Sequence, residues 1–249
     1  MNRCLINQQI CNESYSATGL KSIDKKLQNI TVLQYSQKEQ LYIAAANSDK
    51  MSIYGVKPKM GASLNVRKGD FKVVDFGGTY IIKPQNIRFP SLPENEALTM
   101  LLARQAGIEV PACGLLRCSD GSLSYFIKRF DRLSAGKKLS VEDFTQLSQA
   151  NRQMKYQSSM EKLVTIIDDN CHFPYPEKVK FFRRVIFNFI CGNEDMHLKN
   201  YSLIALPKKG IRLAPAYDFL NSTMTYMSLD RPLQKIEESA LPLKGKKRK

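Results

Sequence analysis

The chain has 249 residues, enough for one large domain or for two lobes that share a cleft, and its 43% hydrophobic and 24% charged residues are ordinary for a folded protein. Its formal charge of +15, from 38 basic and 23 acidic residues, favours polyanionic partners such as nucleotides, nucleic acid or an acidic protein. No apolar run approaches the roughly 20 residues that span a bilayer, and no signal-peptide pattern follows Met1, so we expect a cytoplasmic protein with no membrane insertion. The six cysteines show no tight pair of spacings, which indicates reduced thiols.

The first half of the chain predicts a small antiparallel sheet that follows an N-terminal extension. Residues 1–45 are polar and weakly patterned, with a short helical signal at 37–46, and we expect the extension at 1–50 to pack on the sheet. Short β-like runs, with glycine-containing turns among them, follow at 62–66, 71–75, 79–83, 113–118 and 124–128.

A helix is predicted at 93–106, between the third and fourth of these runs. It begins with a Pro-Glu-Asn-Glu sequence, which is typical of a first helical turn because proline and acidic side chains are favoured there. Leu98, Leu101 and Leu102 fall on one face, and Gly107 is expected to end the helix.

Lys83 ends the third run after three apolar residues, just before this helix. Kinases place a lysine at the end of a strand against the nucleotide phosphates and position it with a carboxylate from the following helix. Glu96 or Glu94 would supply that carboxylate here. Taken singly, a strand-end lysine is more often solvated, and both acids also simply favour a helix start.

The last run of the sheet contains Phe126, Ile127 and Lys128 and precedes the helical half of the chain. In kinases the segment at this place holds adenine through main-chain groups. These three residues are therefore candidate nucleotide contacts.

The second half of the chain is predicted to be mainly helical. Residues 140–143 read as a capping box, and helical apolar spacing follows at 160–168 and 176–191. The last of these helices carries apolar residues on most sides, so we expect it to be buried and to support the loop at 191–200.

That loop places Asp195 five positions before Asn200. Protein kinases use this spacing in their catalytic loop, where the Asp takes the hydroxyl proton and the Asn holds a metal ion. The same Asp would also serve as a helix or turn cap. His197 fits a packed neutral imidazole, and Lys199 fits a surface charge or a phosphate contact equally well.

A hairpin is predicted after the loop, at 201–205 and 211–214, and Asp218 follows it. Kinases place a second magnesium-binding carboxylate after the corresponding strand. Asp218 alone would be read as a turn residue, but the order Lys83, Glu96, Asp195, Asn200, Asp218 is hard to obtain by chance. Together these groups would orient a hydroxyl, hold Mg²⁺ through oxygen atoms and balance the charge of the ATP phosphates.

The chain is similar to the HipA family of toxin kinases. The motifs that carry the resemblance cover about residues 50 to 225 and lie at 52–59, 80–84, 93–96, 128–132, 192–200 and 216–219. The resemblance implies an α+β, two-lobed protein-kinase-like fold, related to phosphoinositide kinases, with a small antiparallel β-rich N-lobe and a mainly helical C-lobe. It also implies a serine/threonine protein kinase that uses ATP and Mg²⁺.

The resemblance assigns roles to single residues. Asp195 would be the catalytic base, with Asn200 and Asp218 as magnesium ligands, beside Lys83 on the nucleotide. Ser52, Gly55 and Lys59 would lie in the nucleotide-binding loop. Outside that loop, Glu96, His197 and Lys199 would be further nucleotide-binding residues. In this family the serine at the position of Ser52 is autophosphorylated as an off-switch, whereas by itself Ser52 reads as a turn residue.

The resemblance also implies domains and partners. The expected parts are an extension at 1–50, an N-lobe at 51–132 and a C-lobe at 133–249 that is incomplete at its C-terminus. Family members phosphorylate an aminoacyl-tRNA synthetase and are restrained by a HipB-like antitoxin, which alone brings them to DNA. Short, HipT-like members also have a small HipS-like partner. Action in the cytoplasm of its own cell and delivery to another cell both remain open.

Two other functions are compatible with the same residues. One is a lipid or small-molecule kinase, which the basic surface would support at an anionic membrane. The other is a catalytically silent module that binds an antitoxin–DNA complex. The identity of a substrate cannot be read from the shared transfer machinery.

Overall fold

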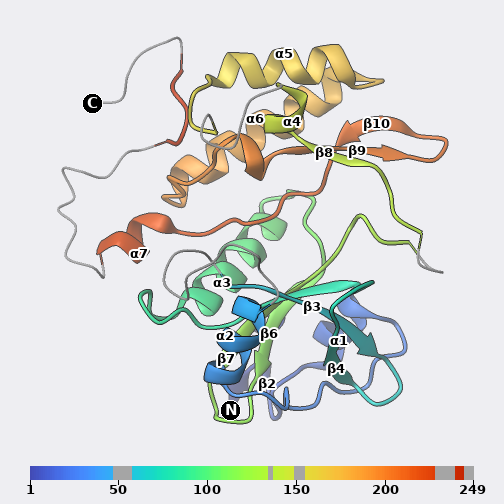
Figure 1. The fold of residues 1–249 in the computed structure, drawn as a ribbon, viewed down its shortest axis with the longest axis vertical. Coiled ribbons are helices and arrows are strands. Elements are labelled where there is room, and N and C mark those ends of the chain that lie inside the picture. The colour runs from blue at the N-terminus through green and yellow to red at the C-terminus, as the bar shows by residue number, and fades with distance from the viewer. Residues whose placement is uncertain (47–57, 134–136, 149–154, 228–238, 244–249) are drawn as a thin grey trace. The chain divides into compact units, whose positions relative to one another are not determined.

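The computed structural model describes residues 1–46, 58–133, 137–148, 155–227 and 239–243 (Figure 1). The chain forms two compact units, which are described separately below. Unit 1 comprises Met1–Leu101 and Pro111–Arg129, and unit 2 comprises Leu102–Val110 and Phe130–Lys249. Both contain helices and antiparallel sheet, so the chain is an α+β protein.

Unit 1 is built on a five-stranded antiparallel sheet with the strand order β4-β3-β5-β7-β6 (Figure 1). The predicted strands are confirmed to within a few residues. They are β3 (Met60–Asn65), β4 (Asp70–Val73), β5 (Tyr80–Lys83), β6 (Cys113–Arg117) and β7 (Leu123–Lys128).

One face of this sheet forms the core of unit 1. Successive side chains of a strand point to opposite faces, so Tyr80 and Ile82 of β5 turn inward together with Phe126 of β7. The ring of Phe71 lies 5.1 Å from the rings of both Tyr80 and Phe126. These aromatic pairs hold β4, β5 and β7 together across the sheet.

The N-terminal residues complete the same core. They form β1 (Asn2–Arg3), β2 (Ile10–Cys11), α1 (Ala17–Ile23) and α2 (Gln37–Ala46), and the last of these confirms the predicted helix. Leu20, Leu33 and Ala44 are buried with the sheet residues. Because these apolar side chains share one core with the sheet, residues 1–46 fold as part of unit 1.

The helix α3 (Leu92–Gln105) ends as predicted at Gly107, which adopts a φ of +74° and donates its N–H to Arg104 O. The three leucines of the predicted face are not all buried, however. Leu101 is buried, but Leu98 and Leu102 are exposed. The buried side of the helix instead carries residues of mixed polarity: Glu96, Thr99, Met100, Leu101 and Ala103.

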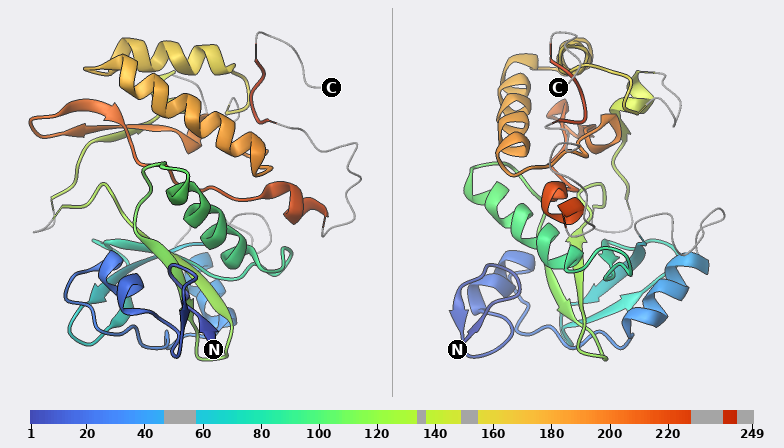
Figure 2. Two further views of the ribbon diagram at one scale, coloured as in Figure 1. Left: turned by 180° about the vertical axis from the view of Figure 1, so that it is seen from behind. Right: turned by 90° about the vertical axis from the view of Figure 1, so that its left-hand side faces the viewer.

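Unit 2 has two long helices that lie side by side over a three-stranded sheet of order β10-β9-β8 (Figure 2). The predicted hairpin is confirmed as β9 and β10, and the two predicted helices are confirmed as α5 and α6. The elements are β8 (Val141–Asp143), α4 (Phe144–Leu147), α5 (Met160–Asn170), α6 (Pro174–Ile190), η3 (Leu198–Asn200), β9 (Ser202–Leu206), β10 (Gly210–Leu213) and α7 (Ser222–Met227).

The predicted capping box at 140–143 is wrong. Val141–Asp143 form β8, which pairs with β9. The box lies three residues later, where the Asp143 side chain accepts from Gln146 N and the Gln146 side chain accepts from Asp143 N. Pairing with a distant strand has displaced the start of the helix.

The prediction that α6 is buried on most sides is also wrong. Phe181 is buried, but Phe182, Ile186, Phe189 and Ile190 are exposed. Among the described residues no helix combines the length and the apolar character needed to cross a membrane.

Candidate active site

Lys83 and Glu96 form a close ion pair in unit 1. The Lys83 Nζ lies 2.6 Å from Glu96 Oε1, and the two side chains are only 14% and 8% exposed. Glu96, rather than Glu94, is thus the carboxylate that meets the strand-end lysine. The ammonium also lies 5.5 Å from the centre of the Tyr125 ring, an attractive cation–π distance.

The two elements that carry this pair fix its position. Lys83 ends β5, where it is in register with Tyr125 of the neighbouring β7. Glu96 lies near the start of α3. An ion pair with little exposure is weakly screened, so Lys83 keeps its charge directed at one place instead of sampling solvent.

The strand β7 has neighbours on both sides, and this bears on the predicted adenine contacts. Phe126 is paired with Ile82 of β5 and with Gly114 of β6, and Ile127 likewise pairs in both directions. Their main-chain groups therefore serve the sheet, and Phe126 is fully buried. Lys128 N donates to Ala112 O at 2.8 Å, so these main-chain donors are engaged within unit 1, and the adenine contact stays a prediction.

The predicted nucleotide loop is only partly described. Ser52 and Gly55 lie outside the described residues. Lys59 is exposed and immediately precedes β3.

In unit 2 the loop after α6 is held by a network of main-chain contacts. Gly192, with a φ of +65°, places its carbonyl where the hydroxyls of Ser222 and Thr223 donate to it at 3.2 and 3.1 Å. Ser222 also accepts from Glu194 N at 2.7 Å. A Cβ on Gly192 would lie 2.8 Å from Thr223 Oγ1, so this approach requires glycine.

Asp195 is oriented from three directions. Its N–H donates to Asn193 Oδ1 at 3.3 Å, and its carbonyl accepts from Asn200 Nδ2 at 2.8 Å. The hydroxyl of Tyr156 donates to Asp195 Oδ1 at 2.8 Å. The carboxamide of Asn200 is thus bonded to the main chain of Asp195, so the loop itself links the two residues of the predicted pair.

His197 is 6% exposed and, like Asp195, contacts the segment that contains Lys155 and Tyr156. Its Nε2 lies 3.0 Å from Lys155 Nζ and 3.9 Å from Asp195 Oδ1. The edge of its ring meets the Tyr156 ring at a centroid distance of 5.1 Å. This environment fits the structural interpretation of His197 as a packed imidazole that shapes the loop.

Lys199 is half-buried in η3, and its carbonyl accepts from the Tyr217 hydroxyl at 3.0 Å. Desolvation raises the pKa of the half-buried Tyr217 phenol well above the usual range, so the hydroxyl stays protonated and able to donate. This bond holds Tyr217, which precedes Asp218, beside Lys199, which precedes Asn200. Asn200 and Asp218 therefore lie on adjacent segments.

The extended segment that leads to Asp218 is held at each step by side chains and main chain of unit 2. Glu177 Oε2 accepts from Leu213 N at 3.1 Å, and the Arg184 guanidinium donates to Ala214 O at 2.7 Å. Ala216 N donates to Glu109 O at 2.8 Å. At its end Asp218 has a φ of +57°, a conformation uncommon for a non-glycine residue and often found at functional sites.

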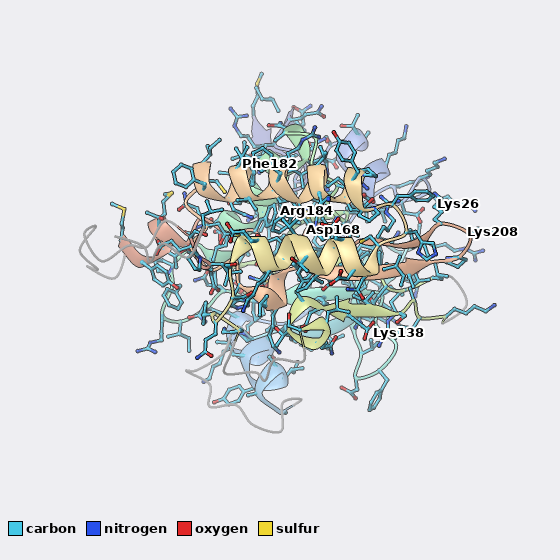
Figure 3. All side chains as sticks on the ribbon, turned by 90° about the horizontal axis from the view of Figure 1, so that it is seen from above. Lys26, Lys138, Asp168, Phe182, Arg184 and Lys208 are labelled. Atoms are coloured by element: carbon cyan, nitrogen blue, oxygen red, sulfur yellow. The ribbon has the colours of Figure 1, made fainter. Side chains whose placement is uncertain are left out.

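Arg184 is 3% exposed and lies between α6 and α5 (Figure 3). Desolvation lowers the pKa of its guanidinium to about 10, which leaves it charged at neutral pH. A buried cation is thus the donor that fixes the strand before Asp218.

The oxygen atoms of Asn200 and Asp218 fit a magnesium ion. Mg²⁺ prefers oxygen ligands and takes only one or two of them from protein in nucleotide sites. Because Asn200 uses its Nδ2 for Asp195 O, its Oδ1 would be the atom that coordinates the ion, together with a carboxylate oxygen of Asp218.

Lys155, Tyr156, Glu177 and Arg184 contact the loop or the strand before Asp218 but were not singled out from the sequence. Tyr156 and Lys155 carry no motif that would reveal them. Glu177 and Arg184 could have been found from the sequence. Charged residues within an apolar helix pattern indicate that their side chains bond to buried polar groups.

Comparison with known proteins places the chain in one family. Residues 51–249 match the model of the HipA-like C-terminal domain. A protein of Haemophilus influenzae that is named "Putative kinase" is 31% identical over 83% of this chain and 63% of its own length. The serine/threonine-protein kinase toxin HipA of Shewanella oneidensis is 25% identical over 70% of this chain and 44% of its own length.

Two solved structures share the fold. HipA of Shewanella oneidensis, in a complex with HipB and operator DNA, matches with a TM-score of 0.60 and 22% identity over 80% of this chain and 53% of its own. The Helicobacter pylori proinflammatory kinase CtkA matches with a TM-score of 0.50 and 17% identity over 68% of this chain and 65% of its own. The expected protein-kinase-like fold is thereby confirmed, and the chain spans less than two thirds of the length of the curated relatives it matches.

Proposed function

The chain belongs to the HipA-like family, and from this premise we propose that it is an ATP-dependent serine/threonine protein kinase. The observation that carries the proposal is the ion pair of Lys83 and Glu96 at 2.6 Å. Protein kinases need this strand-lysine and helix-glutamate pair in place to engage the nucleotide phosphates. A strand-end lysine with no such task would gain more from solvation than from a nearly buried partner.

The residues of unit 2 would supply the catalytic base and the magnesium ligands. Asp195, held through its main chain and by Tyr156, accepts or orients the proton of the attacking hydroxyl. Asn200 and Asp218 hold magnesium, which when bound neutralises charge on the phosphates. Lys83 contributes a further positive charge at the phosphates. His197 and Lys199 support the loop around Asp195 and Asn200.

Substrate and regulation follow the family. We propose a protein hydroxyl as the acceptor, on an aminoacyl-tRNA synthetase, and autophosphorylation of Ser52 as the off-switch. The solved HipA complex contains HipB and operator DNA, and this supports a HipB-like antitoxin as partner, with DNA reached only through it. A HipS-like small partner and a cytoplasmic site of action belong to the same proposal.

The test is incubation with labelled ATP and Mg²⁺, comparing the wild type with Asp195→Ala. Asp169→Ala is the matched control, because Asp169 is an exposed aspartate of α5 outside the loop. Transfer to protein that Asp195→Ala abolishes and Asp169→Ala preserves supports the proposal, and Ser52→Ala should then remove the self-labelling.

Two results would contradict the proposed protein kinase activity and indicate another function. Asp195-dependent labelling of lipid vesicles without labelling of protein would identify a lipid kinase. Nucleotide binding with no turnover, and partner binding that Asp195→Ala leaves unchanged, would identify a silent binding module.

A further inference from the structure

The helix α6 presents its apolar side to solvent and its polar side to the interior. The residues that it buries are Glu177, Phe181, Arg184 and Asn188. The large apolar residues on and just before it that are exposed are Phe173 (72%), Tyr175 (77%), Val179 (46%), Phe182 (64%), Ile186 (43%), Phe189 (60%) and Ile190 (76%). An apolar surface of this extent on one helix marks an interaction site.

Polar contacts lock α6 in this orientation. Glu177 accepts from the main chain of β10, and Arg184 donates to Ala214 O. Asn188 Oδ1 accepts from Asn193 Nδ2 at 3.1 Å in the loop that follows. A rotation of the helix to bury Phe182 would break all of these bonds and leave buried polar groups unpaired, which is costly. Figure 3 accordingly shows Phe182 on the side of α6 away from α5.

The spacing of the exposed residues identifies the shape of the partner. Tyr175, Val179, Phe182, Ile186 and Phe189 follow one another at intervals of four, three, four and three residues. This is the seam of a heptad pattern, which packs against another α-helix by knobs-into-holes contacts. The seam is about 21 Å long at 1.5 Å per residue, which matches a single helix of about four turns.

The charges beside the seam identify the chemistry of the partner. Among the heptad positions that flank the seam, Lys178 and Arg183 carry charge and both are basic, while Pro176, Val185 and Ile190 occupy the others. Lys178 pairs with Asp168 of α5 at 2.7 Å, while Arg183 is exposed and donates to Gly107 O at 3.3 Å. A second copy of this helix would bring like charges together, so acidic flanking residues are favoured.

We propose that α6 is a docking site for an amphipathic α-helix with acidic flanks that belongs to another polypeptide. Apolar residues of that helix bury the seam, and its carboxylates face Lys178 and Arg183. A membrane surface is less suitable, because the narrow heptad seam is matched to a helix, whereas an interfacial helix needs a broad apolar face. The proposal does not depend on kinase activity.

The experiment measures binding of a fluorescent designed peptide of about five helical turns, with leucine at the seam positions and glutamate at the flanks. The wild-type chain should bind it, and Phe182→Glu should weaken binding about 10- to 100-fold, as expected for the loss of one buried aromatic contact. Phe76→Glu is the control, because Phe76 is 93% exposed and lies in unit 1; it should leave binding unchanged.

A charge exchange tests the flanks. Arg183→Glu should weaken the glutamate-flanked peptide and strengthen a lysine-flanked one. Equal binding of both peptides by the wild type, or equal effects of Phe76→Glu and Phe182→Glu, would overturn the proposal. So would a dimer in light scattering that Phe182→Glu dissociates, or binding to anionic vesicles in preference to the peptide.

Discussion

Replacing Tyr156 by Phe removes one hydroxyl from the loop and leaves the ring in place. The hydroxyl donates to Asp195 Oδ1 at 2.8 Å, and the ring packs on His197 at 5.1 Å. Because phenylalanine keeps the ring contact, Tyr156→Phe tests the hydrogen bond alone.

The size of the effect follows from that bond. A hydrogen bond to a charged group contributes about 1.5–3 kcal/mol, and Tyr156 is 45% exposed, so the lower end applies. If the bond is needed to orient the proposed base in the transition state, kcat should fall about tenfold, since about 1.4 kcal/mol is a factor of ten. The KM for ATP should stay the same, because the hydroxyl donates to the proposed base and not to Lys83, Asn200 or Asp218, to which the proposal assigns the phosphates and magnesium.

The assay is steady-state phosphoryl transfer from labelled ATP at several ATP concentrations. Tyr42→Phe, which changes a 58% exposed tyrosine of α2, serves as the control. A kcat within twofold of the wild type would refute the reasoning. A rise in kcat would also refute it, because Tyr156 would then be competing with the substrate hydroxyl for Asp195.

Two further predictions concern the supports of the site, and a third concerns Asp120 in the turn between β6 and β7. Gly192→Ala should lower both kcat and the melting temperature, because the new Cβ would lie 2.8 Å from Thr223 Oγ1; transfer assays and calorimetry measure the two losses. Arg184→Met should lower the melting temperature by several degrees, since the charged donor to Ala214 O is lost, at about 2–4 °C per kcal/mol for a chain of this size. Asp120 has a pKa lowered by the Ser122 hydroxyl, so its contribution to stability is present above the unfolded pKa of about 3.9 and is lost as pH falls through the folded value. The difference in melting temperature between the wild type and Asp120→Asn should therefore shrink between pH 5 and pH 2.

The strands and helices were predictable where short-range patterns decide them. The glycine-containing turns separate the runs that become β3 to β7, and Gly107 ends α3 through a left-handed conformation that other residues rarely adopt. The pairing of Lys83 with an acid was foreseen from its place before the helix. The choice of Glu96 over Glu94 depends on the helix phase, which the sequence pattern does not determine.

The buried side of α6 could not be predicted from apolar spacing. That spacing finds the apolar face and assumes that this face is buried, whereas the structure buries Glu177 and Arg184 to hold the strand before Asp218. The same limitation explains why Tyr156 was missed. Its contact with Asp195 joins residues 39 positions apart, and no local pattern reports such a contact.

The central claim is that Asp195 serves phosphoryl transfer, and the initial rate of transfer from labelled ATP to protein, wild type against Asp195→Asn, tests it most directly. The asparagine keeps the size of the side chain but cannot accept the hydroxyl proton. We expect the rate to fall about 10²- to 10⁴-fold, the usual contribution of a general base, with nucleotide binding and melting temperature preserved. A rate for Asp195→Asn within a few-fold of the wild type would contradict the claim.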